Sequence, residues 1–279
     1  MSSFFRLLLC CCALTVWTST AMLAQDDEET SKLPERRKAY IDPVVSNKEI
    51  LTIGLHGGLG MTSHSGSFTG APGQFSCCPE FSGGSGSGII AGLDVSMPLS
   101  DQLRLLLRIS MQGIGGRFET SEPTTIRRGN EAVPTSFLHT FETEATMIAI
   151  EPAVEYRMGG LGLVGGLRAG LVSSATYTQT ESLSDKTVPY TFPNGKQEYL
   201  NVGGDLTTIS SMQIGLLAGL RYHLALSENL SVIPEVMYAP NFTKLESDMD
   251  WGVSSFRVGA TIALTLWGKN VIATPLMPK

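Results

Sequence analysis

Nine charged residues stand among glycine, serine and threonine at positions that would share the polar face of extended segments. Each member of the set is an arginine, an aspartate or a glutamate, and they are Asp94, Arg104, Arg108, Glu151, Glu155, Arg168, Arg221, Glu235 and Arg257. Arginine suits enclosed ion pairs because its planar guanidinium bonds a carboxylate through two parallel N–H groups. When residues are counted along each segment from the nearest short turn, residues of opposite charge lie at similar distances from the turn. The set predicts a buried network of ion pairs.

Other residue types with possible chemistry offer no such pattern. His56 and His223 fall on polar strand faces, where we expect packed side chains, and His64 and His139 fall in polar loops, where we expect solvated ones. No histidine, cysteine or carboxylate cluster has the spacing of metal ligands. Residues 160–165 match G-x-G-x-x-G, but a dinucleotide site needs a helix after the glycines and a strand is expected here. We therefore predict no catalytic, cofactor-binding or metal site, and no enzymatic activity.

Two adjacent cysteines, Cys77 and Cys78, remain after the N-terminal segment that carries the other three. A disulfide between neighbours in the chain is strained, so an intermolecular bridge and two free thiols both stay open beside a pair that stiffens a loop. We expect no activity from this pair.

Composition and the N-terminus limit the class of protein. The chain has 279 residues, a net charge of −6 and only 16% charged residues, so it has no basic surface for nucleic acid. Residues 1–24 read as a secretory signal peptide, with Arg6 before an apolar stretch and a small-residue cleavage site between Ala21 and Ala24. No later apolar run approaches the length of a spanning helix. Any membrane span must therefore be built from strands.

Eight segments between residues 50 and 267 alternate apolar and polar residues with a period of two, which is typical of strands. Their approximate bounds are 51–61, 89–97, 103–111, 148–158, 163–171, 212–222, 230–238 and 258–266. Short connections at 98–102, 159–160 and 225–229 alternate with long polar ones at 62–87, 113–140, 173–207 and 239–252. Short turns at one end and long loops at the other predict an antiparallel up-and-down barrel.

Residue usage predicts which face of this barrel points outward. All eight lysines lie in the linker, the loops or the tail, whereas strands wetted by bulk water usually carry outward lysines. Tyr156, Tyr222 and Tyr238 lie on the apolar face near strand ends, as an interfacial girdle would. The apolar face is therefore expected to contact lipid and the nine charged residues to fill the lumen. A soluble, lipocalin-like barrel with the reverse orientation is the alternative.

Three stretches give the chain a resemblance to a known family. They are GIIAGLDVSMPLSDQLRLLLRISM (88–111), IAIEPAVEYRM (148–158) and GLLAGLRYHLALSENLSVIPEVMY (215–238). They look like the strand–turn–strand hairpins of the small outer-membrane β-barrels of Gram-negative envelopes, the OmpA/OmpX type. The resemblance implies an eight-stranded barrel in the outer membrane, with both termini in the periplasm.

The expected organisation is a signal peptide (1–24), a disordered periplasmic linker (25–49), an all-β transmembrane barrel (50–267) and a C-terminal tail (268–279). We expect a structural or surface-contact role through four long extracellular loops, with the lumen plugged by the charged network. A narrow passive channel and a soluble ligand-binding barrel are the alternatives. Expected partners are outer-membrane lipid, the assembly machinery and extracellular or envelope partners of the loops, with no nucleic acid and no cofactor.

Overall fold

A computed structural model of the chain describes residues 45–70, 78–128, 130–187, 190–246 and 249–271. The predicted signal peptide, residues 25–44 of the predicted linker and residues 272–279 of the predicted tail lie outside these ranges. The described residues form eleven strands. In these ranges no helix is long and apolar enough to cross a membrane.

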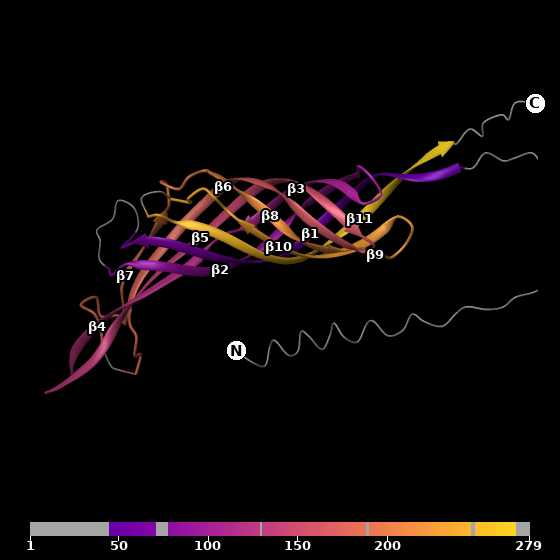
Figure 1. The fold of residues 1–279 in the computed structure, drawn as a ribbon. Coiled ribbons are helices and arrows are strands. Elements are labelled where there is room, and N and C mark those ends of the chain that lie inside the picture. The colour runs from indigo at the N-terminus through magenta and orange to yellow at the C-terminus, as the bar shows by residue number, and fades with distance from the viewer. Residues whose placement is uncertain (1–44, 71–77, 129, 188–189, 247–248, 272–279) are drawn as a thin grey trace, which may run out of the picture. The chain divides into compact units, whose positions relative to one another are not determined.

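Eight of the eleven strands close a cylinder (Figure 1). The strands are β1 (Val45–Phe68), β2 (Phe81–Pro98), β3 (Leu103–Gly113), β4 (Gly116–Arg128), β5 (Glu131–Met158), β6 (Leu161–Leu183), β7 (Glu198–Asp205), β8 (Met212–Tyr222), β9 (Leu224–Ala225), β10 (Leu230–Pro240) and β11 (Gly252–Val271). Around the ring, β1, β2, β3, β5, β6, β8, β10 and β11 each pair antiparallel with the next. β11 pairs back with β1 and closes the cylinder. The predicted eight-stranded up-and-down barrel is confirmed.

Short turns connect the strands at one end of the cylinder, which we call the turn end. The β5–β6 hairpin turns through Gly159 and Gly160 alone, between the paired residues Met158 and Leu161. Gly159 has a φ of 63°, which a glycine adopts without steric cost and which matches the tight turn that a twisted hairpin needs. The β2–β3 and β8–β10 connections turn at the same end. The opposite end carries the long connections, and we call it the loop end.

The strands extend beyond the predicted bounds at both ends. At the turn end β1 and β11 pair from Val45 and Val271, so the predicted limits at residues 50 and 267 fall inside paired strand. At the loop end, the predicted loops at 113–140 and 173–207 are largely strand, which corrects the prediction. β4 and residues 131–143 of β5 form one hairpin, and β7 adds to β6. These segments are rich in threonine, which favours extended backbone without producing a clean apolar alternation.

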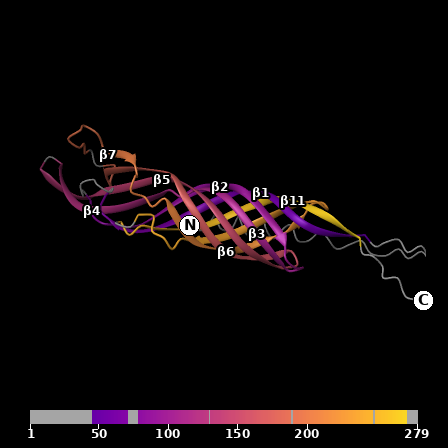
Figure 2. The ribbon, with the colours of Figure 1, turned by 90° about the horizontal axis from the view of Figure 1, so that it is seen from above.

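Strand extensions build an arm that projects from the barrel at the loop end. We define the arm as β4, residues 131–143 of β5, residues 176–182 of β6, and β7, paired in that order. Figures 1 and 2 both show β4 and β7 beyond the cylinder. Strands of about 9–11 residues suffice to cross a bilayer, whereas β5 has 28 residues and β6 has 23. The excess length forms the arm.

The outside of the cylinder is an apolar belt. Its exposed side chains include Leu55, Leu59, Met61, Ile89, Leu93, Leu107, Ile109, Ile150, Leu167, Leu216, Leu220, Val258, Ile262 and Leu264. Tyr156, Tyr222 and Trp267 lie on it near the turn end, and Tyr238 and Phe256 near the loop end. From Phe256 to Trp267 the strand rises about 28 Å along the axis at a tilt of about 40°, close to the height of the apolar band of known barrels. This architecture is that of a transmembrane β-barrel, and a soluble barrel with an apolar interior is excluded.

Candidate functional site

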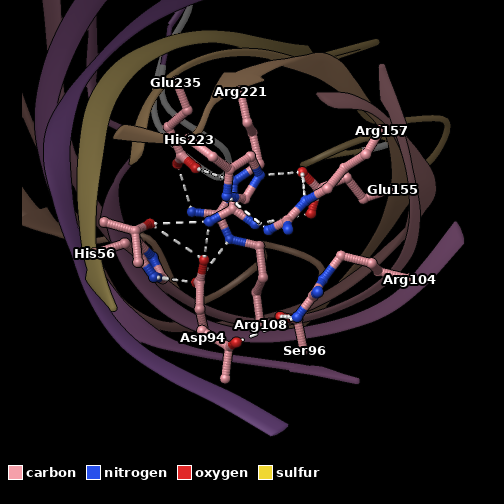
Figure 3. A network of polar contacts seen from close by, with 12 residues as sticks. His56, Asp94, Ser96, Arg104, Arg108, Glu155, Arg157, Arg221, His223 and Glu235 are labelled. Atoms are coloured by element: carbon pink, nitrogen blue, oxygen red, sulfur yellow. Dashed lines mark hydrogen bonds and ion pairs between the residues drawn. The ribbon is translucent and has the colours of Figure 1, made fainter. Parts of the chain in front are cut away.

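A closed ring of alternating charges crosses the middle of the lumen (Figure 3). Asp94 on β2 lies 3.0 Å from Arg108 Nε and 2.7 Å from Arg221 Nη2. Glu235 on β10 lies 2.6 Å from Arg108 Nη2 and 3.2 Å from Arg221 Nε. Each arginine therefore contacts both carboxylates, and each carboxylate contacts both arginines. All four side chains are buried.

His56 and Thr261 also contact Asp94. His56 Nδ1 lies 2.7 Å from Asp94 Oδ1, and the Thr261 hydroxyl donates to Oδ2 at 3.2 Å. Asp94 thus has partners on β1, β3, β8 and β11 at once. A carboxylate taken from water into a narrow lumen is stable only with such compensation.

A second group of charges lies towards the turn end. Glu155 hydrogen-bonds His223 Nε2 and lies 3.6 Å from Arg157 Nε and 3.9 Å from Arg221 Nη1. Arg157 Nη2 in turn lies 2.7 Å from His223 Nδ1. This group links β5 to the residue after β8.

Arg104 binds a residue of β1 at the same end. Its Nη1 donates to Glu49 Oε2 at 2.8 Å, its Nη2 also contacts Glu49, and Nη2 donates to Ser96 at 3.0 Å. Glu49 belongs to β1, although the sequence placed it in the linker. A cavity of about 350 Å³ opens beside this pair and is lined in part by Arg104 and Arg157. The buried Arg104 and the partly exposed Arg157 therefore line the inner side of the turn-end opening.

A third group, which we call the upper cluster, lies towards the loop end. It contains Glu151, Arg168, Arg257, Gln112 and Ser110, and all five are buried. Glu151 lies 2.7 Å from Arg257 Nη1, 3.3 Å from Arg168 Nε and 4.0 Å from Arg108 Nε. Arg168 Nη2 also donates to Gln112 Oε1 at 2.6 Å. With this group, all nine charged residues singled out from the sequence lie in the lumen and each contacts an oppositely charged side chain.

Glycines on the inner faces make room for the charged side chains. A Cβ at Gly92 would overlap the ring of His56 and the carbonyl oxygen of Ile109, and a Cβ at Gly162 would overlap the carboxylate of Glu155. The interior of an eight-stranded barrel is only just wide enough for its own side chains. The lumen is therefore filled by long charged side chains beside glycines, together with short polar residues such as Thr261 and apolar ones such as Leu106.

An aromatic cluster fills the barrel beyond the belt at the loop end. Its largest members are Trp251, Phe68, Phe81, Phe118, Phe141 and Tyr177. Phe118 and Trp251 meet edge to face with ring centroids 5.6 Å apart, and Phe141 and Tyr177 stack at 5.7 Å. The cluster was not predicted, because most of its members lie in segments expected to be loops. Around Phe118, Phe141 and Trp251 the aromatic residue has a polar residue or a glycine on each side, and this alternation could have indicated strands with a buried face.

His64 lies inside the aromatic cluster, which corrects the expectation of a solvated loop residue. Trp251 Nε1 donates to His64 Nδ1 at 3.0 Å, and His64 Nε2 faces the carbonyl oxygen of Gly115 at 3.1 Å. The outward neighbours Ser63 and Ser65 are polar and exposed, so His64 lies outside the membrane-spanning part of β1. Burial lowers the pKa of His64 from its ordinary value near 6.5 to about 4, against the opposing effect of the Gly115 carbonyl. The imidazole is therefore neutral at pH 7.

His139 is the second histidine whose expected solvated position is wrong. It is 1% exposed on the arm, where β4 and β6 flank β5. Its Nε2 lies 3.6 Å from Glu122. The expectation of a solvated loop failed because the segment is a central strand rather than a loop. His56 and His223, by contrast, occupy the lumen as predicted.

Cys78 is disulfide-bonded and accepts a hydrogen bond from Gln179 Nε2 at 3.1 Å, whereas Cys77 lies outside the described residues. Among the residues that the structure describes, no group of three or more histidines, cysteines and carboxylates is arranged to hold a metal ion.

Neither protein-family models nor curated protein sequences match this chain. Solved structures resemble it in fold. The attachment invasion locus protein Ail of Yersinia pestis has 11% identity and a TM-score of 0.36 over 77% of this chain and 99% of its own. Neisserial surface protein A has 12% identity and a TM-score of 0.33 over 77% and 97%. The outer membrane protease OmpT of Escherichia coli has 9% identity and a TM-score of 0.32 over 79% and 98%.

Proposed function

We propose that the protein is an integral outer-membrane barrel that does not conduct solutes and presents a rigid arm for contacts at the cell surface. The observation that carries the proposal is the combination of an apolar belt with a lumen filled along its length. The charge ring, the group around Glu155 and the upper cluster occupy the part within the belt. The aromatic cluster occupies the part beyond it.

The filled lumen argues against the narrow channel that the sequence left open. Barrels that hold an open aqueous pore use about 16–18 strands, twice the number here. The interior of this barrel contains buried arginines whose partners lie on other strands, so a path for solute would require breaking several ion pairs at once. The charges therefore support a plug rather than a conducting lining.

Surface contact is supported by the construction of the arm. Aromatic rings pack together at its tip, since the buried Phe192 lies 5.7 Å from Phe137, 5.0 Å from Tyr190 and 5.4 Å from Tyr199 between ring centroids. β7 is the last strand of the sheet, and its Tyr199 and Val202 are about two-fifths exposed. Aromatic and aliphatic side chains exposed on a rigid edge strand are the kind of surface that partner proteins bind.

Two experiments test this proposal. Trypsin added to intact cells should cleave at the exposed Lys186 and Lys196 of the connection between β6 and β7, and should leave the barrel in the outer-membrane fraction. Recovery as a soluble periplasmic protein would refute the membrane assignment.

Cells that display the chain are then tested for attachment to other cells and to surfaces coated with host proteins. Attachment should fall when Tyr199 and Val202 are both replaced by Ser. Lys196→Gln at the same tip is the control, and equal attachment by all three chains would refute the surface-contact role.

A further inference from the structure

The upper cluster carries more positive than negative charge. Arg168 and Arg257 both pair with Glu151, and within the described residues no second carboxylate lies within 4.0 Å of either guanidinium. Arg168 is 2% exposed and Arg257 is 5% exposed. Arg108, at 4.0 Å from Glu151, is already held by the two carboxylates of the ring. Two buried cations therefore share one anion in a lumen of low dielectric, where an uncompensated charge is strongly unfavourable.

The same cluster contains polar groups that have no hydrogen-bond partner in the described part of the chain. Four of them can donate, namely Arg168 Nε, Arg257 Nη2, Gln112 Nε2 and Ser110 Oγ, and one, Glu151 Oε2, can only accept. Arg168 Nε lies 3.3 Å from Glu151 Oε1, but only as an ion pair. Buried donors in folded proteins nearly always have an acceptor. Four free donor groups thus stand against one free acceptor, so the cluster is short of acceptors as well as of negative charge.

Ion pairs, a hydrogen bond and strand pairing bring these donors to one region. Arg168 is joined to Gln112 at 2.6 Å, and Glu151 joins Arg168 to Arg257. The amide nitrogen of Gln112 points to Gly60, where a Cβ would lie 2.9 Å from it, and Gly60 is the strand partner of Arg257. Ser110 is the preceding inward residue of β3. β1, β3, β6 and β11 therefore supply the walls of one donor-rich region.

We propose that the upper cluster binds a small monovalent inorganic anion such as chloride. Arg168 and Arg257 supply the positive charge, and Gln112 and Ser110 supply neutral donors. A single anion would balance the excess cation and accept several of the free hydrogen bonds. The ring closes the lumen on one side of the cluster and the aromatic cluster closes it on the other, which favours a monatomic ion over an organic acid. This site is independent of what the arm contacts.

Thermal unfolding of the full-length protein in detergent tests the proposal. At constant ionic strength, the midpoint should be several degrees higher in sodium chloride than in sodium gluconate, because an ion that binds only the folded state stabilises it. Gln112→Glu places a carboxylate beside Arg168 in place of the anion, and its midpoint should no longer depend on chloride. Gln213→Glu is the matched control, since Gln213 is equally buried in the lumen but donates to the carbonyls of Met212 and Lys244. This variant should keep the chloride dependence.

Crystals of the unaltered protein grown with bromide provide a second readout that needs no variant. An anomalous peak is expected within hydrogen-bonding distance of Arg168 and Arg257. The proposal is overturned by equal midpoints in chloride and gluconate, by a chloride dependence that persists in Gln112→Glu, or by bromide crystals with no peak in the cluster.

Discussion

Arg108 and Arg221 lie on opposite hairpins of the barrel and are bound by the same two carboxylates, Asp94 and Glu235. Around the ring of eight strands, the β2–β3 pair stands four positions from the β8–β10 pair. The four side chains therefore tie two opposite walls of the cylinder together across its lumen. Two like charges can lie close to each other here because each has two partners of opposite charge.

Replacing Asp94 by Asn should destabilise the barrel by about 3–5 kcal/mol, since Arg108 and Arg221 would each keep only part of their compensation in a buried site. Thermal or urea unfolding in detergent measures the loss. Glu142→Gln is the control because Glu142 pairs with Arg117 on the exposed surface of the arm, and such a pair contributes about 0–1 kcal/mol. Equal effects of the two substitutions would contradict a structural role for the ring.

Purified protein in planar bilayers should give no reproducible conductance steps, because the lumen is filled by ion pairs within the belt and by aromatic rings beyond it. Single-channel recording beside a sixteen-stranded porin checks this expectation. Steps of constant size that recur between preparations would favour the narrow channel instead.

Trp251→Ala should cost about 3–5 kcal/mol of stability, the usual range for removing a fully buried large aromatic side chain. Limited proteolysis should also cut the loop end sooner, since Trp251 packs on Phe68, Phe118 and Phe141 from other strands. Phe242→Ala, at an exposed aromatic position, is the comparison and should stay within about 1 kcal/mol. A smaller loss at Trp251 than at Phe242 would mean that the cluster does not stabilise the barrel.

Acidification should weaken the loop end through His64. Its folded-state pKa of about 4 lies below the ordinary value near 6.5, so the unfolded chain binds the proton first. The stabilisation of the folded state by neutral His64 is therefore fully present above pH 6.5 and is lost as the pH falls towards 4. The difference in unfolding midpoint between the wild type and His64→Gln, measured from pH 7 to pH 4, should shrink over this window. A pH-independent difference would contradict the prediction.

Gly92→Ala should destabilise the barrel strongly, because the added methyl group would overlap both the His56 ring and the Ile109 carbonyl oxygen. Gly165→Ala is the matched change on an outward strand position, where nothing lies within 4 Å of the added carbon. It should leave the unfolding midpoint in detergent near that of the wild type. The prediction fails if both variants unfold together.

The eight strands of the barrel, the orientation of the sheet and the inward charges followed from local pattern. A period of two assigns Leu107 and Arg108 to opposite faces, and the absence of lysine from the strands indicated which face meets lipid. The strands of the arm and the buried states of His64 and His139 did not follow. Threonine-rich segments such as residues 173–183 resemble polar loops when considered alone, and they become strands because a neighbouring strand supplies hydrogen-bond partners.

The sequence by itself therefore determined that Asp94, Arg108, Arg221 and Glu235 face the lumen, because alternation along one strand needs no knowledge of any other strand. Only the tertiary structure decided that they bind one another, that Glu49 reaches Arg104, and that two arginines share Glu151. Which side chains meet across a cylinder depends on the stagger between strands and on the pairing of β1 with β11. Arg108 and Glu235 are separated by 127 residues, and closure of the barrel brings them to 2.6 Å.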